Sequence, residues 1–556
     1  MLDELDPDQI ADPVLRGQLV ALLNLLEKAL SENSLLKVEV QRLKDELIRL
    51  KGGQGRPPFK PAKNHSSLSS EKDRSEAEPG YTRPPKKEPK NAKLTIDRTE
   101  ILQIDRQSLP QDAVFKGHEE VIVQDVLFQT ETILFRKEKF YSPSQRLSYT
   151  AALPQGYVGQ FGPGVKAWVL NLYFAGGMSE PKLLEFLHTV GLEVSAGQLS
   201  DWLIKNQEMF HTEKAEVVKA GIASSPWQHL DSTATTLFGQ TQHCHILCNP
   251  LYTAYTTLPS KDRLSLLKVL LGGGGVAPLF RLDPRALTLL EEAGVAVKWR
   301  KQLEELPFEQ DWSEAQLDQL LAKHLPKLKP HPLKVIKDIL ALTSYHARLD
   351  YPVVQLLVCD DAPVFNGLTT ELALCWLHEA RHYKKLRPQS GYAKRRYNEF
   401  MSQLWDYYRE LLVYRLAPSE AEAGRLSKKF ERIFAVSSGY EQLDERKALT
   451  LAKKKELLAV LAHPEIPLHN NPAELGARQR VRKRDVSLQA CKAEGLAAWD
   501  TFQSLVQTAK KLGVNSYRYL YDRVSGQHKM PSLASLISQK AAGLNLGQSW
   551  LTADTT

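Results

Sequence analysis

Acidic side chains lie in two β-prone runs of the sequence. Asp231 lies in the first run, which reads WQHLDSTATTLF. The second run reads YPVVQLLVCDDAPVF, a continuously apolar strand of the buried parallel kind that ends on Asp360 and Asp361. α/β folds place their chemistry at the carboxyl edge of the sheet, where such strand-end acids gather. The two runs therefore predict a carboxylate at the end of each of two strands.

A third acid lies on an expected helix. HNNPAELGARQRVRKR opens this helix, with Asn470 or Asn471 as its cap, Pro472 in its first turn and Glu474 after it. Hard divalent ions prefer carboxylate oxygens, and two ions about 4 Å apart can activate and receive the two oxygens of a phosphoryl displacement. The three acids together predict a pair of Mg²⁺ ions, for which Mn²⁺ can substitute. The plain alternative is that each acid only caps a helix or a strand.

Basic residues beside the third acid favour a polyanionic partner. The 73 Lys and Arg against 65 Asp and Glu give a net charge of +8, which permits such a partner without establishing one. Arg478 and Arg482 lie one and two turns beyond Glu474 on the same helix face and could neutralise phosphates. The alternative is a solvated helix face. The expected DNA contacts are Lys205, Arg478, Arg480, Arg482, Lys483 and Arg484.

A competing metal motif begins at His378. His378, Glu379 and His382 satisfy H-E-x-x-H, the signature of zinc peptidases, after the apolar stretch LALCWL. A zinc peptidase is therefore an alternative function. A second group is His243, Cys244, His245 and Cys248, but strand alternation puts its histidines and cysteines on opposite faces, which argues against one four-ligand site.

The N-terminal segment carries a heptad pattern. Asn33 falls in phase with the apolar positions, and a buried Asn in such a seam fixes register, most often of a parallel dimer. The pattern predicts a coiled-coil dimerisation helix that ends at Gly52 and Gly53; the alternative is a helix that packs on the protein's own body. The seam residues are Leu15, Leu19, Leu22, Leu26, Ala29, Asn33, Leu36, Val40, Leu43, Leu47 and Leu50.

The segments that follow the heptads differ in composition. Residues 51–93 are rich in Pro, Gly, Ser and Lys and predict a disordered basic tether. Residues 94–150 alternate, as in VIVQDVLFQTETILF, and predict a small β-rich element. Helices are then expected at 163–174, 179–190 and 195–205, with Gly191 ending the second and Ser195 and Gln198 forming a capping box. Three such helices fit a helix-turn-helix that enters a DNA groove.

The central region predicts an interrupted α/β core. The runs WQHLDSTATTLF, HCHILCNP and TAYTTLP read as an antiparallel meander. A helical insertion with a Gly-rich hinge at 272–275 separates this meander from the strand that ends on Asp360, and a second helical insertion precedes Glu474.

Several classes of protein are excluded by the composition. No apolar run reaches the length of a membrane-spanning helix, and the acidic start MLDELDPDQIADP is not a secretory signal. Five scattered cysteines in 556 residues favour a reducing compartment over a disulfide scaffold.

Taken together, these blocks resemble the DDE transposases of bacterial insertion sequences of the IS-sixty-six type. The resemblance covers most of the chain and includes the heptads, NHSSLSSEK and GPGVKAWVLNLYFAGGMSEPKLLEFLHTVGLEVSAGQLSDWL. It continues through HLDSTATTLFG, LLVCDDAPVF and CWLHEARHYKKL. The most specific block is HNNPAELGARQRVRKR with the later GLAAWDTFQSLVQTAKKLGVNSYRYLYDRV.

The resemblance implies an RNase H-like core with a three-acid site. The family's Asn-Asn-x-x-Glu signature makes Glu474 the third catalytic acid, and Asp231 and one of Asp360 and Asp361 the others. Asp360 is preferred because Phe365 then takes the place of the family's aromatic residue five positions on, with Asp361 as its rival.

Two further features bear on the resemblance. H-E-x-x-H coincides with the family's Cys-Trp-x-His-x-x-Arg pattern, here Cys375, Trp376, His378 and Arg381, which favours the transposase over the peptidase. Many relatives carry a Cys-rich zinc element before the helices, but this chain has no Cys before Cys244, so no structural zinc is expected.

The resulting hypothesis is a DNA transposase that binds terminal inverted repeats and cuts and joins DNA by two-metal phosphoryl transfer. The alternative is a catalytically inactive, transposon-derived DNA-binding protein. Expected partners are double-stranded DNA of the element ends and target, a second copy through residues 15–50 in a dimer or higher oligomer, and accessory proteins of the element, in the bacterial cytoplasm at the nucleoid. The predicted domains are a coiled coil (1–50), a basic linker (51–93), a β-rich element (94–150), a helix-turn-helix-like domain (151–215), the first part of an RNase H-like core (216–261), a helical insertion (262–350), the strand with the second acid (351–373), a second helical insertion (374–465), the helix with the third acid and the C-terminal helices (466–530), and a tail (531–556).

Overall fold

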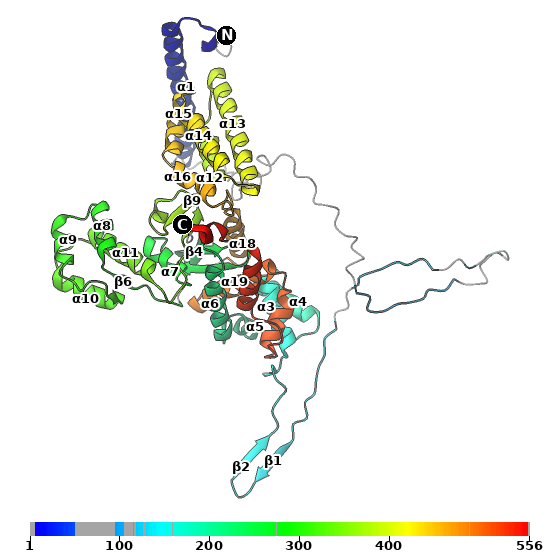
Figure 1. Ribbon diagram of the computed structural model, residues 1–556. Helices are drawn as coiled ribbons and strands as arrows, with labels where there is room; N and C mark the ends of the chain where they lie inside the picture. The colour runs from blue at the N-terminus through cyan, green and yellow to red at the C-terminus, as the bar shows by residue number, and fades with distance from the viewer. Residues whose placement is uncertain are drawn as a thin grey trace.

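A five-stranded mixed sheet lies at the centre of the protein (Figure 1). The structure is a computed structural model that describes residues 6–50, 95–104, 110, 115, 118–125, 129–157, 159–273, 275–488 and 490–553. The strand order is β5-β4-β3-β8-β9. The strands are β3 (Trp227–Leu237), β4 (Gln240–Cys248), β5 (Thr253–Leu258), β8 (Leu356–Cys359) and β9 (Glu371–Leu374).

The sheet combines an antiparallel half with a parallel half. β3, β4 and β5 pair antiparallel, as the three short runs predicted. β3 also pairs parallel with β8, and β8 with β9. All four residues of β8 are buried, as expected for an apolar strand in a parallel position. The predicted meander and the predicted buried parallel strand are both confirmed, within a mixed α/β architecture.

Helices cover both faces of the sheet. Side chains alternate along β3, so Gln228 and His229 point to opposite faces. Gln228 donates a hydrogen bond to the Ser225 carbonyl just after α6 (Glu208–Ala223), which places α6 on its face. His229 contacts Asn470 at the start of α18 (Asn471–Ser487), which covers the other face.

The outer edge of β5 is covered by α19 (Ala493–Lys511). Polar side chains four residues apart on α19, about 6 Å along its axis, match the spacing of alternate residues in a strand. These side chains accept hydrogen bonds from the outward-facing backbone N–H groups of β5. Without them, β5 would be an open edge of the sheet. The N–H groups of Thr253, Tyr255 and Thr257 donate to Thr508 Oγ1 at 3.2 Å, Ser504 Oγ at 2.9 Å and Asp500 Oδ2 at 2.6 Å, respectively.

Two groups of helices interrupt the sheet. The first lies between β5 and β8 and includes a two-stranded pairing of β6 (Phe280–Arg281) with β7 (Asp311–Trp312). The second lies between β9 and α18. The helices of the first are α7 (Arg263–Leu270), α8 (Pro284–Glu292), α9 (Val297–Leu303), α10 (Glu314–His324) and α11 (Pro330–Ala347). After β8 comes the 3₁₀ turn η6 (Pro363–Phe365), and the second group comprises α12 (Trp376–Lys384), α13 (Gly391–Leu416), α14 (Glu420–Ala435), α15 (Glu441–Leu451), α16 (Lys454–Leu457) and α17 (Ala459–Ala462).

The expected helices before the sheet are confirmed as α3 (Pro163–Phe174), α4 (Glu180–Thr189) and α5 (Ala196–Ile204). Gly191, at a φ of 81°, follows the end of α4, and Ser195 Oγ accepts the Gln198 N–H at the start of α5. The C-terminal helices that follow α19 are α20 (Ser516–Val524), α21 (Leu533–Leu544) and α22 (Gln548–Ala553).

The region before α3 holds less β-structure than the sequence predicted. β1 (Lys139–Ser142) and β2 (Leu147–Thr150) form an antiparallel hairpin. The described residues from 95 to 138 contain no strand, although VIVQDV alternates. Val121 and Val123 are exposed there, so this alternation has no sheet face to bury. The predicted tether, 51–93, lies outside the described residues.

The N-terminal helix α1 (Pro13–Leu50) packs in part on the protein's own body. It follows a 3₁₀ turn, η2 (Pro7–Gln9), and its first half lies beside α13 and α15 (Figure 1). Leu23 and Glu27 are buried. For its first half, the alternative of a helix that packs on the protein's own body is therefore the one that the structure shows. Beyond that half, Leu36, Val40, Leu43 and Leu47 of the heptad seam are exposed.

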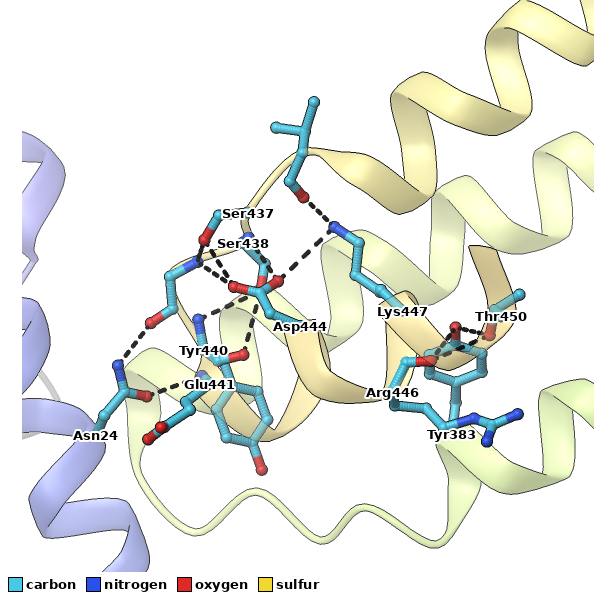
Figure 2. A network of polar contacts seen from close by, with 12 residues as sticks. Asn24, Tyr383, Ser437, Ser438, Tyr440, Glu441, Asp444, Arg446, Lys447 and Thr450 are labelled. Atoms are coloured by element: carbon cyan, nitrogen blue, oxygen red, sulfur yellow. Dashed lines mark hydrogen bonds and ion pairs between the residues drawn. The ribbon is translucent and has the colours of Figure 1, made fainter. Parts of the chain in front are cut away.

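Polar side chains of α1 bind the backbone at two helix starts. Asn24 Nδ2 donates to the Gly439 carbonyl at 3.0 Å and Asn24 Oδ1 accepts the Glu441 N–H at 3.0 Å, at the start of α15 (Figure 2). The Glu27 carboxylate accepts the N–H groups of Gln389 and Ser390 at 2.7 and 2.8 Å, just before α13. Asn24 thus pairs the first N–H of α15, and Glu27 pairs two N–H groups just before α13.

None of the described helices has the length and apolar character that crossing a lipid bilayer requires.

Replacing Glu27 should release α1 from α13. Glu27→Ala leaves two buried N–H groups without their acceptor, which costs about 1–3 kcal/mol each. We expect faster hydrogen–deuterium exchange at Gln389, Ser390 and the first half of α1, with the sheet unchanged. Glu32→Ala removes an exposed carboxylate from the same helix and is the matched control. Equal exchange in the two variants would contradict the docking contact.

Candidate active site

The register of the parallel strands brings two aspartates level. His229 of β3 pairs with Val358 of β8. Continuing this register by two residues brings Asp231 opposite Asp360, on the sheet face shared with His229. Asp231 lies within β3 rather than at its end, so the expectation of a strand-end position is wrong for this residue. The strand continues past Asp231 because β4 stays paired with it as far as Leu237.

α18 carries Glu474 onto the same face. Glu474 is buried at 4% exposure in the first turn of α18. Gly476 permits the close approach, because a Cβ there would lie 2.7 Å from Ile246 Cγ2 of β4. Tyr255 donates its hydroxyl to the Gly476 carbonyl at 3.1 Å. Small residues on α18 therefore set the depth at which Glu474 meets the sheet.

The Asn470 side chain joins α18 to the strand that carries Asp231. Its Nδ2 donates to the Leu230 carbonyl at 2.8 Å, and its Oδ1 lies 3.0 Å from His229 Nδ1. Burial lowers the pKa of His229 to about 3, so the ring is neutral and Nδ1 is the donor in this pair. The Asn470 N–H also donates to Cys375 Sγ at 3.2 Å, just before α12. Asn470 is the N-cap residue of α18, one of the two caps predicted, but its side chain bonds to β3 rather than to an N–H of its own helix.

The three acids interact electrostatically. The pKa of Asp231 is raised to about 7, mainly by burial and also by the negative charges of Asp360 and Glu474. The Ser232 N–H, 2.7 Å from Asp231 Oδ1, and the positive charge of Arg381 oppose this shift. Asp360 and Glu474 are therefore close enough to Asp231 for their charges to act on its carboxylate.

Asp360 and Asp361 have different surroundings. Asp361 is exposed, and its carboxylate forms an ion pair with Lys453. Asp360 Oδ1 is buried and accepts no hydrogen bond from the described residues. A buried carboxylate oxygen without a donor is costly unless a cation binds it. Asp360 therefore fits a metal ligand better than Asp361.

Two side chains of α12 contact Glu474. Arg381 Nη2 lies 3.3 Å from Glu474 Oε2, and His378 Nδ1 lies 3.6 Å from Oε1. Arg381 Nη1 also lies 3.2 Å from His378 Nε2. The sequence had marked these residues only as part of a pattern, and nothing in that pattern indicated their contact with Glu474, 93 residues beyond Arg381.

The H-E-x-x-H residues do not share one site. Glu379 is buried and binds Arg446 and Thr450 of α15, whereas His378 faces Glu474. The side chains within metal-binding reach of one another in the described part of the chain are Cys375, His378 and Glu474, with ligand atoms within 4.8 Å. This grouping differs from the zinc-peptidase arrangement, in which both histidines bind one ion.

The residues of the second candidate metal group lie on two faces of β4, as predicted. Cys244 and Cys248 pack with Ala473 and Ala477 of α18. His245 lies on the other face, with Nδ1 2.7 Å from Ser232 Oγ and Nε2 3.2 Å from the Ser260 carbonyl.

Two of the expected DNA contacts are buried. Arg480 has an exposure of 0%, forms an ion pair with Asp500 of α19, and donates Nε to Cys244 Sγ at 3.2 Å. Lys483 donates to the Tyr173 and Met178 carbonyls at 3.1 and 3.4 Å. Both prolong the face of α18 that packs on the sheet, since they lie three to four residues apart beyond Gly476. The expectation that these two residues contact phosphates is wrong.

The other four basic residues keep access to solvent. Arg482 and Lys205 are exposed, and Arg478 and Arg484 are half-buried. Arg484 donates to the Ala234 carbonyl, and Lys205 forms an ion pair with Asp201 at 2.8 Å.

Replacing Asn470 should separate β3 from α18. Asn470→Ala removes the donor to the Leu230 carbonyl and the acceptor for His229, and we expect the free energy of unfolding to fall by about 1–3 kcal/mol per unsatisfied group. Urea denaturation followed by circular dichroism measures this loss. The control is Asn366→Ala, at an exposed position. A loss no larger than in the control would show that the bridge is dispensable.

Lys483 should make stability rise with pH. Burial lowers the pKa of Lys483 to about 7, against a usual value of about 10.5, so the unfolded chain binds more protons between these values. The free energy of unfolding should therefore increase from pH 7 to 9.5 in the wild type relative to Lys483→Met, by up to about 1.4 kcal/mol per pH unit. Urea midpoints at four pH values test this. Lys510→Met removes an exposed charge from α19 as the control, and parallel wild-type and Lys483→Met curves would contradict the burial of a titrating amine.

Comparison with known proteins identifies the family of this chain. The family described as transposase IS66 family matches residues 344–498, which include Asp360, α12 and Glu474. The chain is also 31% identical over 335 residues to the uncharacterized protein y4jO of Sinorhizobium fredii (strain NBRC 101917 / NGR234), covering 58% of this chain and 100% of that protein. On these similarities, the chain belongs to the transposase IS66 family.

Proposed function

We propose that this family member binds the terminal inverted repeats of an insertion sequence and catalyses metal-dependent cleavage and transfer of DNA strands. The observation that supports the proposal is the electrostatic interaction of Asp231 with Asp360 and Glu474, three acids carried by separate elements. Asp231 comes from β3, Asp360 from the end of β8 and Glu474 from the first turn of α18. The strand order, with three antiparallel strands followed by parallel ones, supports the proposed RNase H-like core.

The donor set fits hard divalent cations. All three residues offer carboxylate oxygens, the ligands that Mg²⁺ prefers, and one of them, Asp360 Oδ1, is buried without a hydrogen-bond donor among the described residues. A pair of Mg²⁺ ions, or Mn²⁺ in their place, would stabilise charge on the attacking and leaving oxygens of a phosphoryl transfer. The protein's own contribution is to hold the three carboxylates in place through the β3–β8 pairing and Asn470.

The reaction proposed has two steps at one site. Water first attacks a phosphodiester at the element end, which breaks one P–O bond and frees a 3′-hydroxyl. That hydroxyl then attacks a target phosphodiester, so the number of phosphodiester bonds is conserved in the second step.

The DNA would run over the accessible basic residues near Glu474. Arg478 and Arg482 follow Glu474 by one and two turns of α18, and Arg484 and Lys205 extend the basic surface. The helices α3, α4 and α5 supply a candidate helix-turn-helix for the inverted repeats.

A second copy would pair the two element ends. The exposed seam residues Leu36, Val40, Leu43 and Leu47 keep their heptad spacing in the second half of α1, away from the docked Glu27. A parallel coiled coil over this half would bury them without breaking the contacts of the first half.

The test is cleavage of element-end DNA in Mg²⁺ by purified protein. Asp231→Asn, Asp360→Asn and Glu474→Gln should each slow cleavage by about 1,000-fold or more while DNA binding is kept, because each removes a negatively charged oxygen ligand of the site. Asp361→Asn, next in the chain and paired with Lys453, is the matched control and should cleave at nearly the wild-type rate.

Two other results would contradict the proposed function. Cleavage unaffected by Asp231→Asn and Glu474→Gln would refute the site. Tight DNA binding without cleavage by the wild type would favour the alternative, a catalytically inactive DNA-binding protein.

A further inference from the structure

We propose that Arg381, oriented by His378, acts as a cationic clamp that occupies Glu474 in the metal-free protein and competes with the metal ion for it. The proposal rests on the proposed function, because it concerns the same carboxylates. It assigns to α12 a role in metal loading.

The contacts place the clamp on the carboxylate itself. Arg381 Nη2 is 3.3 Å from Glu474 Oε2, and His378 Nδ1 is 3.6 Å from Oε1, so each carboxylate oxygen faces a side chain of α12. Arg381 Nη1 lies 3.2 Å from His378 Nε2, which orients the guanidinium. A Mg²⁺ ion needs a carboxylate oxygen at about 2.1 Å and near-octahedral space around it. A guanidinium and a divalent ion at the same carboxylate repel each other, so each weakens the hold of the other on Glu474.

The charges explain why a clamp is needed. Asp231, Asp360 and Glu474 bring three carboxylates to one partly desolvated face, with Glu474 at 4% exposure. Uncompensated charges of one sign in such a place are costly. The guanidinium offsets part of that cost in the metal-free protein, and a divalent ion offsets it better and displaces the guanidinium.

Contacts with neighbouring elements hold helix α12 in place, while the side chain of Arg381 is able to move. Glu379, on the same helix, is held by Arg446 and Thr450 of α15. The Trp376 N–H and Nε1 donate to the Leu468 and Leu457 carbonyls at 3.0 and 2.8 Å. Arg381 keeps 23% of its side chain exposed. A released guanidinium can therefore swing toward solvent, where a DNA phosphate would approach the site.

Metal binding measured directly tests the clamp. Mn²⁺ titration of the full-length protein, followed by electron paramagnetic resonance without DNA, gives the affinity of the site. Arg381→Gln should bind Mn²⁺ about tenfold more tightly than the wild type, because the competing cation is gone. DNA cleavage should fall in the same variant, since the guanidinium no longer reaches the phosphate. A merely structural arginine would weaken both properties together.

Thermal unfolding supplies a second readout. In EDTA, Arg381→Gln should melt below the wild type, since three carboxylates lose their counter-ion. In saturating Mn²⁺ the difference in melting temperature between the wild type and the variant should become smaller, because the ion stabilises the variant more. Arg387→Gln removes an exposed guanidinium close by in sequence and should change neither the Mn²⁺ affinity nor the melting gap.

The outcomes distinguish a failure of the proposed Arg381 clamp from a failure of the proposed metal site. Weaker or unchanged Mn²⁺ binding by Arg381→Gln would overturn the clamp and leave the site standing, provided that Glu474→Gln reduces Mn²⁺ binding. Failure of the wild type to bind Mn²⁺ at all would overturn both.

Discussion

The bridge made by the Asn470 side chain is the interaction on which the candidate site depends. Leu230, its acceptor, precedes Asp231, and Glu474 lies one turn beyond Asn470 in α18. Asp231 and Glu474 are 243 positions apart in the chain, and the hydrogen bonds of one side chain join the two segments that carry them. An amide is suited to this place because it donates and accepts at once. A carboxylate could accept from His229 but could not donate to the Leu230 carbonyl.

Local patterns predicted the elements of the core, but not which basic residues would be buried. The alternation of β3, β4 and β5 and the apolar run of β8 identified the sheet. The parallel register of β3 and β8, extended by two residues, then brings Asp360 rather than Asp361 opposite Asp231. Arg480 and Lys483 were misjudged because a run of basic residues resembles a solvated surface. Their partners, Asp500 and the carbonyls around Tyr173, lie 20 and about 310 positions away. No local pattern indicates such partners.

The N-terminal helix shows the same division between local and distant information. Its heptads identified a helix and its apolar seam, and the exposed half keeps that seam. The docked half uses Asn24 and Glu27, which the pattern assigns to the polar faces. Their partners are backbone groups at the starts of α13 and α15, which are in place only after those helices have formed. A polar residue on a predicted coiled coil can thus bind its own chain rather than a second copy of it.

The second group of helices connects the N-terminal helix to the candidate site. α15 binds Asn24 at its first turn and Glu379 of α12 near its end, through Arg446 and Thr450. Two residues on from Glu379, Arg381 reaches Glu474. These contacts form a continuous series from α1 through α15 and α12 to Glu474. The insertion is therefore a support for the cations that face Glu474, and its position between β9 and α18 places it where both the helix with the third acid and the N-terminal helix can contact it.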